Sequence, residues 1–408
     1  MSNRKKVRLG DLAAAGRSVI SGPFGSNIGK QYFRNEGIPV IRGNNLTIDY
    51  RKFIDDGFVF LTEEKADELN AYAIEGDLIF TAAGTIGQVG MIPKGGAYKR
   101  YVISNKQLRF RADTEKADPN FLYAWLASPW IFNAITNRNT GSTVPLINLG
   151  IIRSLPVVLP VDISEQKKIA AVLSALDAKI DCNNRINAEL EAMAKTLYDY
   201  WFVQLDFPDA NGKPYKSSGG KMVYNPTLKR EIPAGWEDSL IGDVLGKVPT
   251  TTKILNKNIL ETGLIPVIDQ GQSYICGFTN EQSSLIVPKQ PHVVFGDHTR
   301  AVKLVNFNYA RGADGTQILL SESQRMPGYL MYQVVSDIDL SSYGYARHFK
   351  FLKESRIVLP ERSVAQRYQD VVTPWFKKIK QSIFENQELS RLRDWLLPLL
   401  MNGQVTVA

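Results

Sequence analysis

The chain has 408 residues, of which 44% are hydrophobic and 22% are charged, and its formal net charge is +8. This length predicts two or three domains with ordinary buried cores, and the positive charge suits an anionic partner such as nucleic acid without identifying it. No run of 18 uncharged apolar residues occurs and the first residues lack the apolar stretch of a signal peptide, so we expect a cytoplasmic protein without a membrane segment. Two cysteines and three histidines exclude a disulfide framework and give no spaced cluster for a metal site.

The chain contains a rough copy of itself. The segments 8–12, 38–41 and 159–160 return in similar form at 240–244, 265–268 and 359–360, and a glutamine follows each Leu-Pro by six residues. The offset between the copies falls from 232 residues at Asp11 to 200 residues at Pro160, so the second copy is shorter in its first part only. Solenoid repeats have periods of roughly 20 to 50 residues. Each copy is therefore predicted to be a globular domain with an appendage of fixed length.

Residues 1–160 are predicted to form a mixed, strand-rich domain, because short β-branched or aromatic runs at 58–61, 78–81 and 108–110 alternate with glycine turns. One helix is expected from Pro119 to Thr136. Asp118 precedes it as a candidate N-cap, and proline suits the first turn of a helix. The five aromatic residues of this segment are expected to lie mostly in the core.

The segment from Ser164 to Phe202 has the spacing of a long amphipathic helix, with Ser164 as its candidate N-cap. At 1.5 Å per residue it would be roughly 58 Å long, longer than a small domain is wide, so it needs a helical partner. Apolar steps of three and four are typical of a coiled-coil seam, and Asn183 near the middle either fixes the register as a buried residue or faces water. The stripe includes Ile169, Leu173, Leu176, Ile180, Leu190 and Leu197.

The second copy supplies a partner helix from Ser363 to Met401. Pro374 removes one helical hydrogen bond and is expected to kink or interrupt this helix, and Pro398 is expected to fray its end. Between the first helix and the second globular part, residues 206–233 are rich in Gly, Pro, Ser and Lys and are predicted to be a linker. The stripe of the second helix includes Ile379, Ile383, Leu389 and Leu396.

The chain lacks recognisable catalytic motifs. It has no catalytic tetrapeptide of amino-methyltransferases, no dinucleotide-binding glycine motif and no P-loop. Gly84 and Gly87 follow a strand-like run but have the wrong spacing for a phosphate cradle, so they are predicted to form a turn. His292, His298 and His348 occur in the second copy only, which favours structural histidines over shared general bases. We therefore expect neither catalysis nor a bound cofactor in this chain alone.

Three loops of the first part, and comparable places in the second, carry side chains that suit DNA. Arginine can read guanine edges and asparagine can read adenine edges, whereas Ser, Thr and backbone amides hold phosphates. A plain solvated loop is the competing interpretation for each residue. The candidates in the first part are Lys30, Arg42, Asn44, Asn45, Arg138, Asn139, Thr140 and Ser142, and those in the second part are Lys253, Arg300, Arg347 and Lys350, with Tyr345 and Ala346 in the same stretch.

Taken together, these segments resemble the specificity subunit of type I restriction-modification systems. The specific matches are the Leu-Pro-Val-Val-Leu-Pro and Glu-Gln-Lys-Lys-Ile-Ala motifs within 154–177, the linker ending in Ile-Pro-Ala-Gly-Trp at 232–236, and the closing segment 392–400. The likeness covers essentially the whole chain. Pro374 departs from the family pattern, and the second copy shows no clear counterpart to residues 84–87.

The resemblance implies an α+β protein in which two globular α/β target recognition domains are separated by two long antiparallel α-helices, as a pseudo-twofold internal duplication. The implied parts are a first recognition domain at 1–160, a central helical spacer at 161–205, a linker at 206–233, a second recognition domain at 234–360 and a C-terminal helical spacer at 361–408.

The resemblance also implies a non-catalytic subunit within a restriction endonuclease and adenine methyltransferase complex. Each domain would read one half of a bipartite asymmetric site in double-stranded DNA. The two helices would set the gap between the two half-sites. Through the stripe residues above, they would also dock two methyltransferase (modification) subunits. Restriction subunits with a translocase motor would then join this complex. S-adenosylmethionine would then belong to the modification subunits, and ATP and Mg²⁺ to restriction, with none of them bound by this chain.

Two other interpretations compete with this one. A scaffold protein could use the coiled-coil helix pair for dimerisation without any DNA specificity, and it would lack salt-dependent DNA binding. A stand-alone DNA-modifying enzyme is the second alternative, and the missing catalytic tetrapeptide counts against it.

Overall fold

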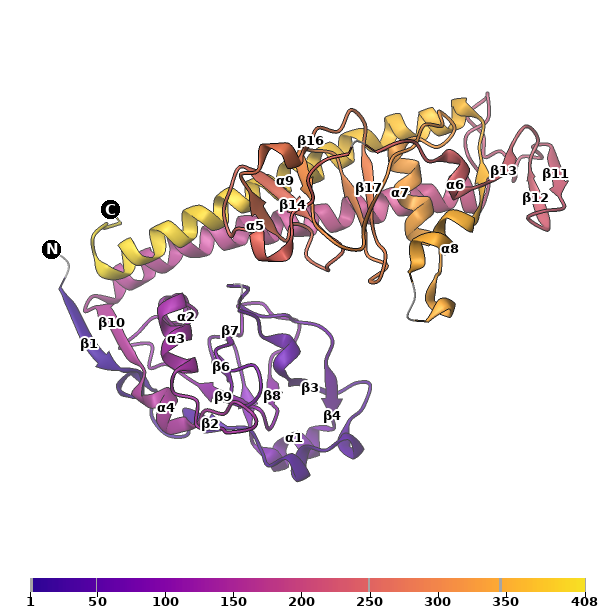
Figure 1. Ribbon diagram of the computed structural model, residues 1–408. Coiled ribbons are helices and arrows are strands. Elements are labelled where there is room, and N and C mark those ends of the chain that lie inside the picture. The colour runs from indigo at the N-terminus through magenta and orange to yellow at the C-terminus, as the bar shows by residue number, and fades with distance from the viewer. Residues whose placement is uncertain (1–2, 49, 249, 345–346, 408) are drawn as a thin grey trace. The chain divides into compact units, whose positions relative to one another are not determined.

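The computed structural model describes residues 3–48, 50–248, 250–344 and 347–407. The chain folds as two compact units, the first made of residues 1–182 and 385–408 and the second of residues 183–384. Each unit contains one mixed α/β body and a part of each of two long helices, α5 (Ile163–Tyr198) and α9 (Arg362–Asn402), which Figure 1 shows in magenta and yellow. The first unit is therefore assembled from two segments far apart in the sequence, whereas the second is one continuous stretch.

The first body is built on two four-stranded sheets and a strand pair. The first sheet has the order β4 (Val59–Leu61), β3 (Ile38–Ile41), β8 (Tyr101–Ile103), β5 (Tyr72–Ala73), and the second has the order β2 (Val19–Ser21), β9 (Gln107–Phe110), β6 (Leu78–Thr81), β7 (Val89–Met91). Strands β1 (Arg4–Arg8) and β10 (Pro156–Pro160) form the pair. Strands β3 and β8 run parallel. Every residue of β6, β8 and β9 is buried, as expected for short apolar runs at the centre of sheets.

Four helices accompany these sheets: α1 (Glu63–Leu69), α2 (Pro119–Leu126), α3 (Pro129–Thr136) and α4 (Leu149–Ser154). Asp118 caps α2 as predicted, since its carboxylate accepts a 2.9 Å hydrogen bond from the Phe121 amide. The prediction of a single helix over 119–136 is wrong. Ser128 caps a second helix and Pro129 occupies its first position, so the chain restarts a helix where proline cannot continue the previous one.

The second body repeats the strand order of the first. Its first sheet is β15 (Gly277–Thr279), β14 (Ile265–Ile268), β19 (Tyr309–Arg311), β16 (Leu285–Ile286), its second is β18 (Val302–Val305), β17 (His292–Gly296), β20 (Thr316–Leu319), and its pair is β13 (Glu237–Leu240) with β21 (Arg356–Leu359). Helices α6 (Ile241–Val244), α7 (Gly328–Asp337) and α8 (His348–Glu354) complete it. The duplication is confirmed, and β2 is the strand of the first body that has no counterpart in this sheet order.

The strand registers align the two bodies residue by residue. The parallel pair matches Ile41 with Ile103 in the first body and Ile268 with Arg311 in the second, so Arg42 and Asp269 follow equivalent strand ends. The β6–β7 turn at 82–87 corresponds to the β17–β18 turn at 297–300. The expectation that the second copy lacks a counterpart to residues 84–87 is therefore wrong. The counterpart escapes notice in the sequence because it is shorter and shares none of its glycines.

The ends of the long helices differ from the predictions. Asp162, not Ser164, caps α5, because the Asp162 carboxylate accepts a 2.8 Å hydrogen bond from the Ser164 amide. Helix α9 continues through Pro374, where the Thr373 hydroxyl donates to the Gln369 carbonyl at 2.6 Å. Pro374 lies on the exposed side of a helix whose neighbouring residues are buried, and the loss of one hydrogen bond does not interrupt it. The helix also extends beyond Pro398 to Asn402.

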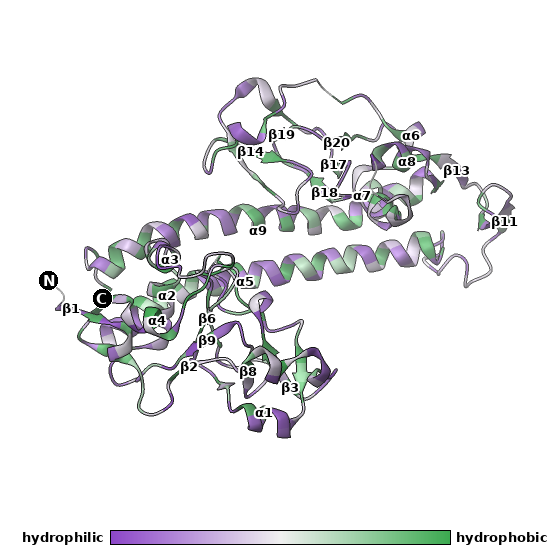
Figure 2. Ribbon diagram, turned by 60° about the horizontal axis from the view of Figure 1, so that its bottom comes forward, coloured by the Kyte–Doolittle hydropathy of each residue, from purple (hydrophilic) through white to green (hydrophobic). Residues whose placement is uncertain are grey.

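The long helices pack against each other in antiparallel fashion. In the first unit, Asp177 and Lys179 of α5 form ion pairs with Arg393 and Glu385 of α9, at 3.2 and 3.4 Å. In the second unit the Tyr368 hydroxyl donates to the carbonyl of Ala194 at 3.1 Å. Apolar and polar residues alternate along both helices (Figure 2).

The predicted apolar stripes face inward. Asn183 is fully buried, which selects the buried alternative for this residue, whereas Met193 and Leu392 on the same stripes are 49% and 42% exposed. The stripe residues named above are buried at Ile169, Leu173 and Ile379 and half-buried at Leu176, Ile180, Leu190, Leu197, Ile383, Leu389 and Leu396. A buried polar residue in such a seam favours one register over others.

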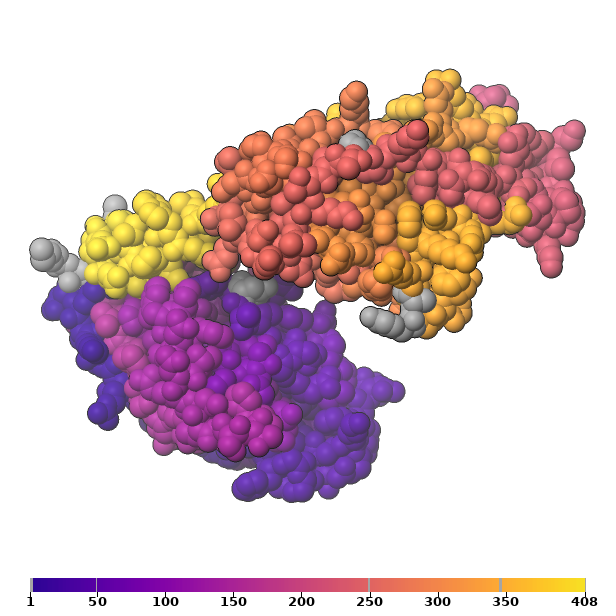
Figure 3. Space-filling model, in the orientation of Figure 1, coloured from indigo at the N-terminus to yellow at the C-terminus, as the bar shows by residue number. Residues whose placement is uncertain are grey.

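The segment predicted as a linker, 206–233, is folded. After a π-helical turn at Asp199–Val203 it forms a hairpin of β11 (Met222–Asn225) and β12 (Arg230–Pro233). The Phe207 ring stacks on Tyr215 and on Trp236, with centroids 4.6 and 5.0 Å apart, which anchors the hairpin. The hairpin projects from its unit (Figure 3). The glycines and prolines of this segment thus serve tight turns rather than a flexible chain.

Candidate nucleic-acid interface

Five loops of the first body meet at one edge, which we call the first edge: residues 22–28, 42–46, 82–88, 104–107 and 138–147. They meet because β3 and β8 run parallel and end together, so that the Ser104 amide donates to the Ile41 carbonyl at 3.0 Å. The amides of Gly22 and Ala82 donate to the carbonyls of Gln107 and Lys106, at 2.9 and 2.7 Å. The loop ends are therefore fixed to one another by backbone hydrogen bonds.

The second body has the same edge, the second edge, made of residues 253–254, 269–271, 297–301, 312–315 and 347–348. The Gly312 amide donates to the Ile268 carbonyl at 2.8 Å, as Ser104 does to Ile41 in the first body. The His348 amide donates to the Asp297 carbonyl at 2.9 Å, as the Ile147 amide does to that of Ala82 at 2.8 Å in the first body. Equivalent loops thus occupy equivalent places in both bodies.

The predicted arginines of the first part lie on the first edge. Arg42 is half-buried and its guanidinium donates to the Gly57 carbonyl at 3.0 Å, whereas Arg138 is exposed and donates to the Ala134 carbonyl at 2.6 Å. Sequence reasoning missed Lys106, an exposed residue of the β8–β9 turn on the same edge. The polar Ser-Asn-Lys triplet between two apolar strands was the available signal.

The neighbouring asparagines have different roles. Asn44 is exposed, and its amide lies 3.5 Å from the Gly57 carbonyl. Asn45 is fully buried, and its amide nitrogen donates to the carbonyls of Ile54 and Asp56, both at 2.9 Å. Its oxygen accepts from the Arg42 amide at 2.9 Å. Because its polar atoms are used inside the body, Asn45 does not fit the predicted base contact, and it instead fixes the loop that carries Arg42.

The loop after α3 is shaped by its own side chains. The Asn139 oxygen accepts from the amides of Gly141 and Leu146, at 2.9 and 2.8 Å. The Thr140 hydroxyl donates to the Leu146 carbonyl at 3.1 Å, and Ser142 is exposed at the loop tip. Asn139 and Thr140 are thus loop-forming residues, which leaves Arg138 and Ser142 as the outward groups of this loop.

Three of the four candidates in the second part lie on the second edge. Lys253 and Arg347 are exposed, and Arg300 is exposed at a left-handed backbone position with φ of 61°. Lys350 instead lies on α8, exposed and 4.0 Å from Glu354. The remaining two residues of that stretch, 345 and 346, lie outside the described residues.

The structure does not bring Lys30 to the first edge. Lys30 is exposed, but the chain there leads toward α1, where the Lys65 ammonium lies 4.1 Å from the ring centre of Tyr32. The Arg34 amide then pairs with Phe60 beside the start of β3, at the opposite end of that strand from Arg42. Lys30 therefore lies two residues beyond the loop 22–28 of the first edge, where the chain leads toward the other end of β3.

The histidines and Gln270 organise the second edge and the sheet behind it. Gln270 accepts from the His298 amide at 3.1 Å and donates to the Asp314 carbonyl at 3.1 Å. His348 is buried with one ring nitrogen 3.0 Å from the Asp297 carbonyl. His292 is buried 3.0 Å from the Tyr309 hydroxyl, and burial lowers its pKa. His292 and His348 thus have internal partners, as predicted for structural histidines.

The two edges differ in charge where they are equivalent in position. Arg42 at the end of β3 corresponds to Asp269 at the end of β14. Beside Asp269, the buried Lys303 ammonium donates to the Asp269 carbonyl at 2.8 Å and lies 3.5 Å from the carboxylate. Burial lowers the pKa of Lys303, and the neighbouring Asp269 opposes that shift. The two edges therefore present different donor and acceptor patterns on the same backbone frame.

Comparison with known proteins places these features in a family. Residues 1–192 match the family model described as the type I restriction modification DNA specificity domain. The specificity subunit of the type I restriction enzyme MjaIX from Methanocaldococcus jannaschii is 23% identical over 415 residues, covering 95% of this chain and 91% of that protein. The HindI specificity subunit from Haemophilus influenzae is 24% identical over 382 residues, covering 75% of this chain and 81% of that protein.

Residues 1–192 thus match a type I restriction modification DNA specificity domain, and the chain resembles type I specificity subunits over nearly its whole length. The crystal structure of an S subunit from M. genitalium has the same fold, with a TM-score of 0.59 at 15% identity, and the match covers 98% of this chain and 96% of that one. Within the described ranges, no helix has the length and hydropathy needed to cross a lipid bilayer.

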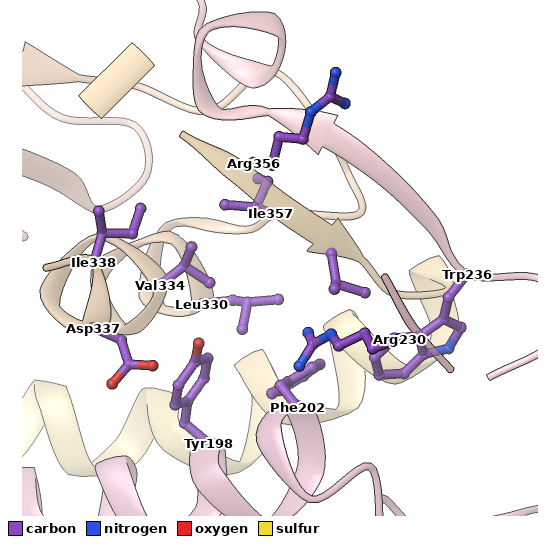
Figure 4. Close-up of a pocket in the computed structure, with 11 residues that line it drawn as sticks. Tyr198, Phe202, Arg230, Trp236, Leu330, Val334, Asp337, Ile338, Arg356 and Ile357 are labelled. Atoms are coloured by element: carbon purple, nitrogen blue, oxygen red, sulfur yellow. The ribbon is translucent and has the colours of Figure 1, made fainter. Parts of the chain in front are cut away.

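The chain also has a pocket at the end of α5, in the second unit (Figure 4). It has a volume of about 150 Å³ and an apolar floor that includes Phe202, Trp236 and Leu330. Charged groups surround this floor, with Asp337 3.2 Å from Lys195 and Arg356 2.8 Å from Asp238. None of the lining residues belongs to the second edge. The pocket is thus distinct from the surface that we assign to DNA.

Proposed function

We propose that this specificity subunit reads a bipartite, asymmetric DNA sequence, with the first edge contacting one half-site and the second edge the other. The observation that carries the proposal is the duplication of one loop-bearing edge on two bodies with the same strand order. The edges carry exposed cations, Arg138 and Lys106 on one and Arg300 and Arg347 on the other. Cations on rigid loops can hold phosphates, and arginine can read guanine.

The difference between the edges supports an asymmetric site. Equivalent positions carry Arg42 and Asp269, which cannot make the same contact with a base pair, because one donates hydrogen bonds and the other accepts them. Two such edges on one chain would read two different sequences. A symmetric protein dimer would instead read a palindrome.

The paired helices α5 and α9 are proposed to set the gap between the half-sites and to dock two methyltransferase subunits. Their support is the antiparallel contact of the helices and the exposed apolar residues on them, such as Met193 and Trp395, which is 63% exposed. Adenine methylation with S-adenosylmethionine would then belong to the methyltransferase subunits, and ATP- and Mg²⁺-dependent cleavage to the restriction subunits. The chain itself is proposed to be non-catalytic and cytoplasmic.

Methylome sequencing tests this proposal directly. Cells that produce the modification subunit with and without this chain are compared, and adenine methylation at a two-part, non-palindromic site is expected only when this chain is present. Identical methylation in both cultures would contradict the proposal.

A separate assay tests the non-catalytic assignment. The purified chain is incubated with DNA and tritiated S-adenosylmethionine, and no label is expected in the DNA until modification subunits are added. Label transferred by the chain alone would favour the stand-alone enzyme. DNA binding that is absent at every salt concentration in the assembled complex would favour the scaffold.

A further inference from the structure

Phe24 on the first edge is an aromatic residue with almost nothing covering it. Its side chain is 83% exposed, more than any other large apolar residue among those that the structure describes. Single exposed apolar residues are common on protein surfaces and need no explanation by themselves. The support beneath Phe24 distinguishes it from such residues.

The backbone on both sides of Phe24 is fixed. The Gly22 amide donates to the Gln107 carbonyl at 2.9 Å, and the Phe24 carbonyl accepts from the Asn27 amide at 2.9 Å. A Cβ atom at Gly22 would lie 1.8 Å from the Ser104 carbonyl oxygen, so the loop lies directly against the β8–β9 turn. Pro23 restricts the backbone further. The backbone that carries the Phe24 ring is therefore held at a defined place on the edge.

The surroundings of this ring are polar and positively charged. A Cβ atom at Gly25 would lie 3.1 Å from the side-chain nitrogen of Asn105, which precedes the exposed Lys106. The same turn is hydrogen-bonded to the end of β3, which is followed by Arg42. A rigid aromatic ring among cations suits nucleic acid, because cations hold phosphates while the ring stacks on a base or enters a base step.

We propose that Phe24 stacks against a base step of the half-site that the first edge reads, and that it perturbs base stacking there. This role rests on the proposed function and adds a specific contact to it. The second body has no counterpart to β2 in its sheet order, and at the matching place the second edge has Lys253 and Ile254 instead of an aromatic ring. The perturbation is therefore confined to one half-site.

The test uses the complex of the full chain with its modification subunits and duplexes that contain its methylated site. The adenine analogue aminopurine replaces one adenine at a time, because its fluorescence rises when stacking is lost. Methyltransferases flip their target adenines out of the duplex, so these positions are set aside. At the remaining adenines, binding of the wild-type complex is expected to raise the fluorescence at one step of one half-site. Phe24→Ala is expected to abolish this rise and to weaken binding about tenfold, at an unchanged salt slope since no charge is lost. Phe24→Trp is expected to retain both signals.

Leu264→Ala is the matched control. Leu264 is 78% exposed, but it precedes β14 and so lies at the strand end away from the second edge. It is expected to leave affinity and fluorescence unchanged. Both residues are mostly exposed, so neither variant is expected to lower the melting temperature.

The outcomes separate this role from the proposed function. If the Phe24→Ala complex keeps the sequence preference, the affinity and the fluorescence signal of the wild type, the proposed role of Phe24 is overturned and the proposed function is not. A wild-type complex that binds its site no better than a shuffled duplex overturns the proposed function and the role of Phe24 with it.

Discussion

The two bodies share a strand order but attach to the long helices by different chemistry. In the first unit the loop after β3 contacts the long helices through charged side chains: Arg393 of α9 lies 4.2 Å from the Tyr50 ring centre, and Lys52 donates to Ser174 of α5 at 3.1 Å. Arg393 also forms an ion pair with Asp177 of α5 at 3.2 Å. Tyr50 and Lys52 lie between β3 and β4. Burial raises the pKa of Asp177 although Arg393 lies beside it, so keeping this carboxylate charged has a cost.

In the second unit the equivalent attachment is aromatic. Tyr274 lies between β14 and β15, and its ring packs on Phe307, whose centroid is 5.0 Å from that of Phe384 on α9. The Tyr274 hydroxyl donates to the Leu304 carbonyl. The comparison shows that the fold requires a firm attachment at this place but does not dictate its chemistry. The two attachments should therefore respond differently to substitution and to salt.

Arg393→Ala is expected to cause the largest loss of folding stability. Arg393 and Asp177 are only 10% and 18% exposed, and removing one partner of such a pair leaves the other charge buried, which costs about 3 kcal/mol. Asp177→Asn is expected to lose less, since it also removes the desolvation cost of the carboxylate. Hydrogen exchange of residues 50–57 measures the local opening. Arg391→Ala is the control on the same helix, because the exposed pair of Arg391 with Glu388 contributes at most about 1 kcal/mol.

Phe384→Ala is expected to destabilise the second attachment by about 2 kcal/mol, below the value for a fully buried phenylalanine because Phe384 is half-buried. Exchange is expected to rise around Tyr274 and Phe307 and to stay unchanged at residues 50–57. Raising the salt concentration should weaken the first attachment slightly and leave the second intact. Equal salt responses in the two units would contradict the contrast between an ionic and an aromatic attachment.

The edges offer a comparison of smaller effects. As a base-reading arginine, Arg300 is expected to lose roughly 1 to 3 kcal/mol of binding free energy at one position of one half-site when changed to alanine. Lys106→Ala is expected to weaken binding to all sequences alike and to reduce the salt dependence of binding by about 1 in slope. Binding assays with mutated half-sites measure both. If both variants altered the sequence preference of the same half-site, the assignment of the first edge to one half-site and the second edge to the other would be contradicted.

The smallest expected effect is the pH response of His292 in the second unit, which contains all three histidines of the chain. Burial lowers the pKa of His292 below its ordinary value of 6.5, so the unfolded state binds more protons. The free energy of unfolding that depends on neutral His292 is therefore fully present above pH 6.5. It is lost as the pH falls below that value, by at most about 1.4 kcal/mol per pH unit. Urea unfolding at pH 7.5 and 5.5 should show a smaller loss in His292→Gln than in the wild type.

Much of the fold could be predicted from periodicity. The duplication, the two long helices with their inward stripes and the Asp118 cap all follow from local patterns. The break at Ser128 and the continuation through Pro374 depend on how neighbouring turns pack, which the sequence does not reveal. Asp162 and Ser164 are both good capping residues, and only the backbone geometry distinguishes them.

The candidate site was harder to predict, because the pairing of the strands decides which loops lie next to one another. The parallel pairing of β3 with β8 brings the turn that carries Lys106 to the loop that carries Arg42, and no spacing in the sequence indicates that the two loops meet. Asn45 has the right chemistry for a base but is turned inward by three hydrogen bonds. The counterpart of the turn at 82–87 emerges only from the pairing of β17 with β18, since the shorter turn shares none of its glycines.

The most direct test of the account lengthens the helix pair. Four residues are inserted in α5 between Ala188 and Glu189, and four in α9 between Lys377 and Lys378, to keep the antiparallel helices matched. One added turn is about 6 Å long, which is about two base pairs at 3.4 Å each. Methylome sequencing is expected to show both half-sites unchanged and a gap longer by about two base pairs. An active enzyme that keeps the original gap, or that reads altered half-sites, would contradict the account.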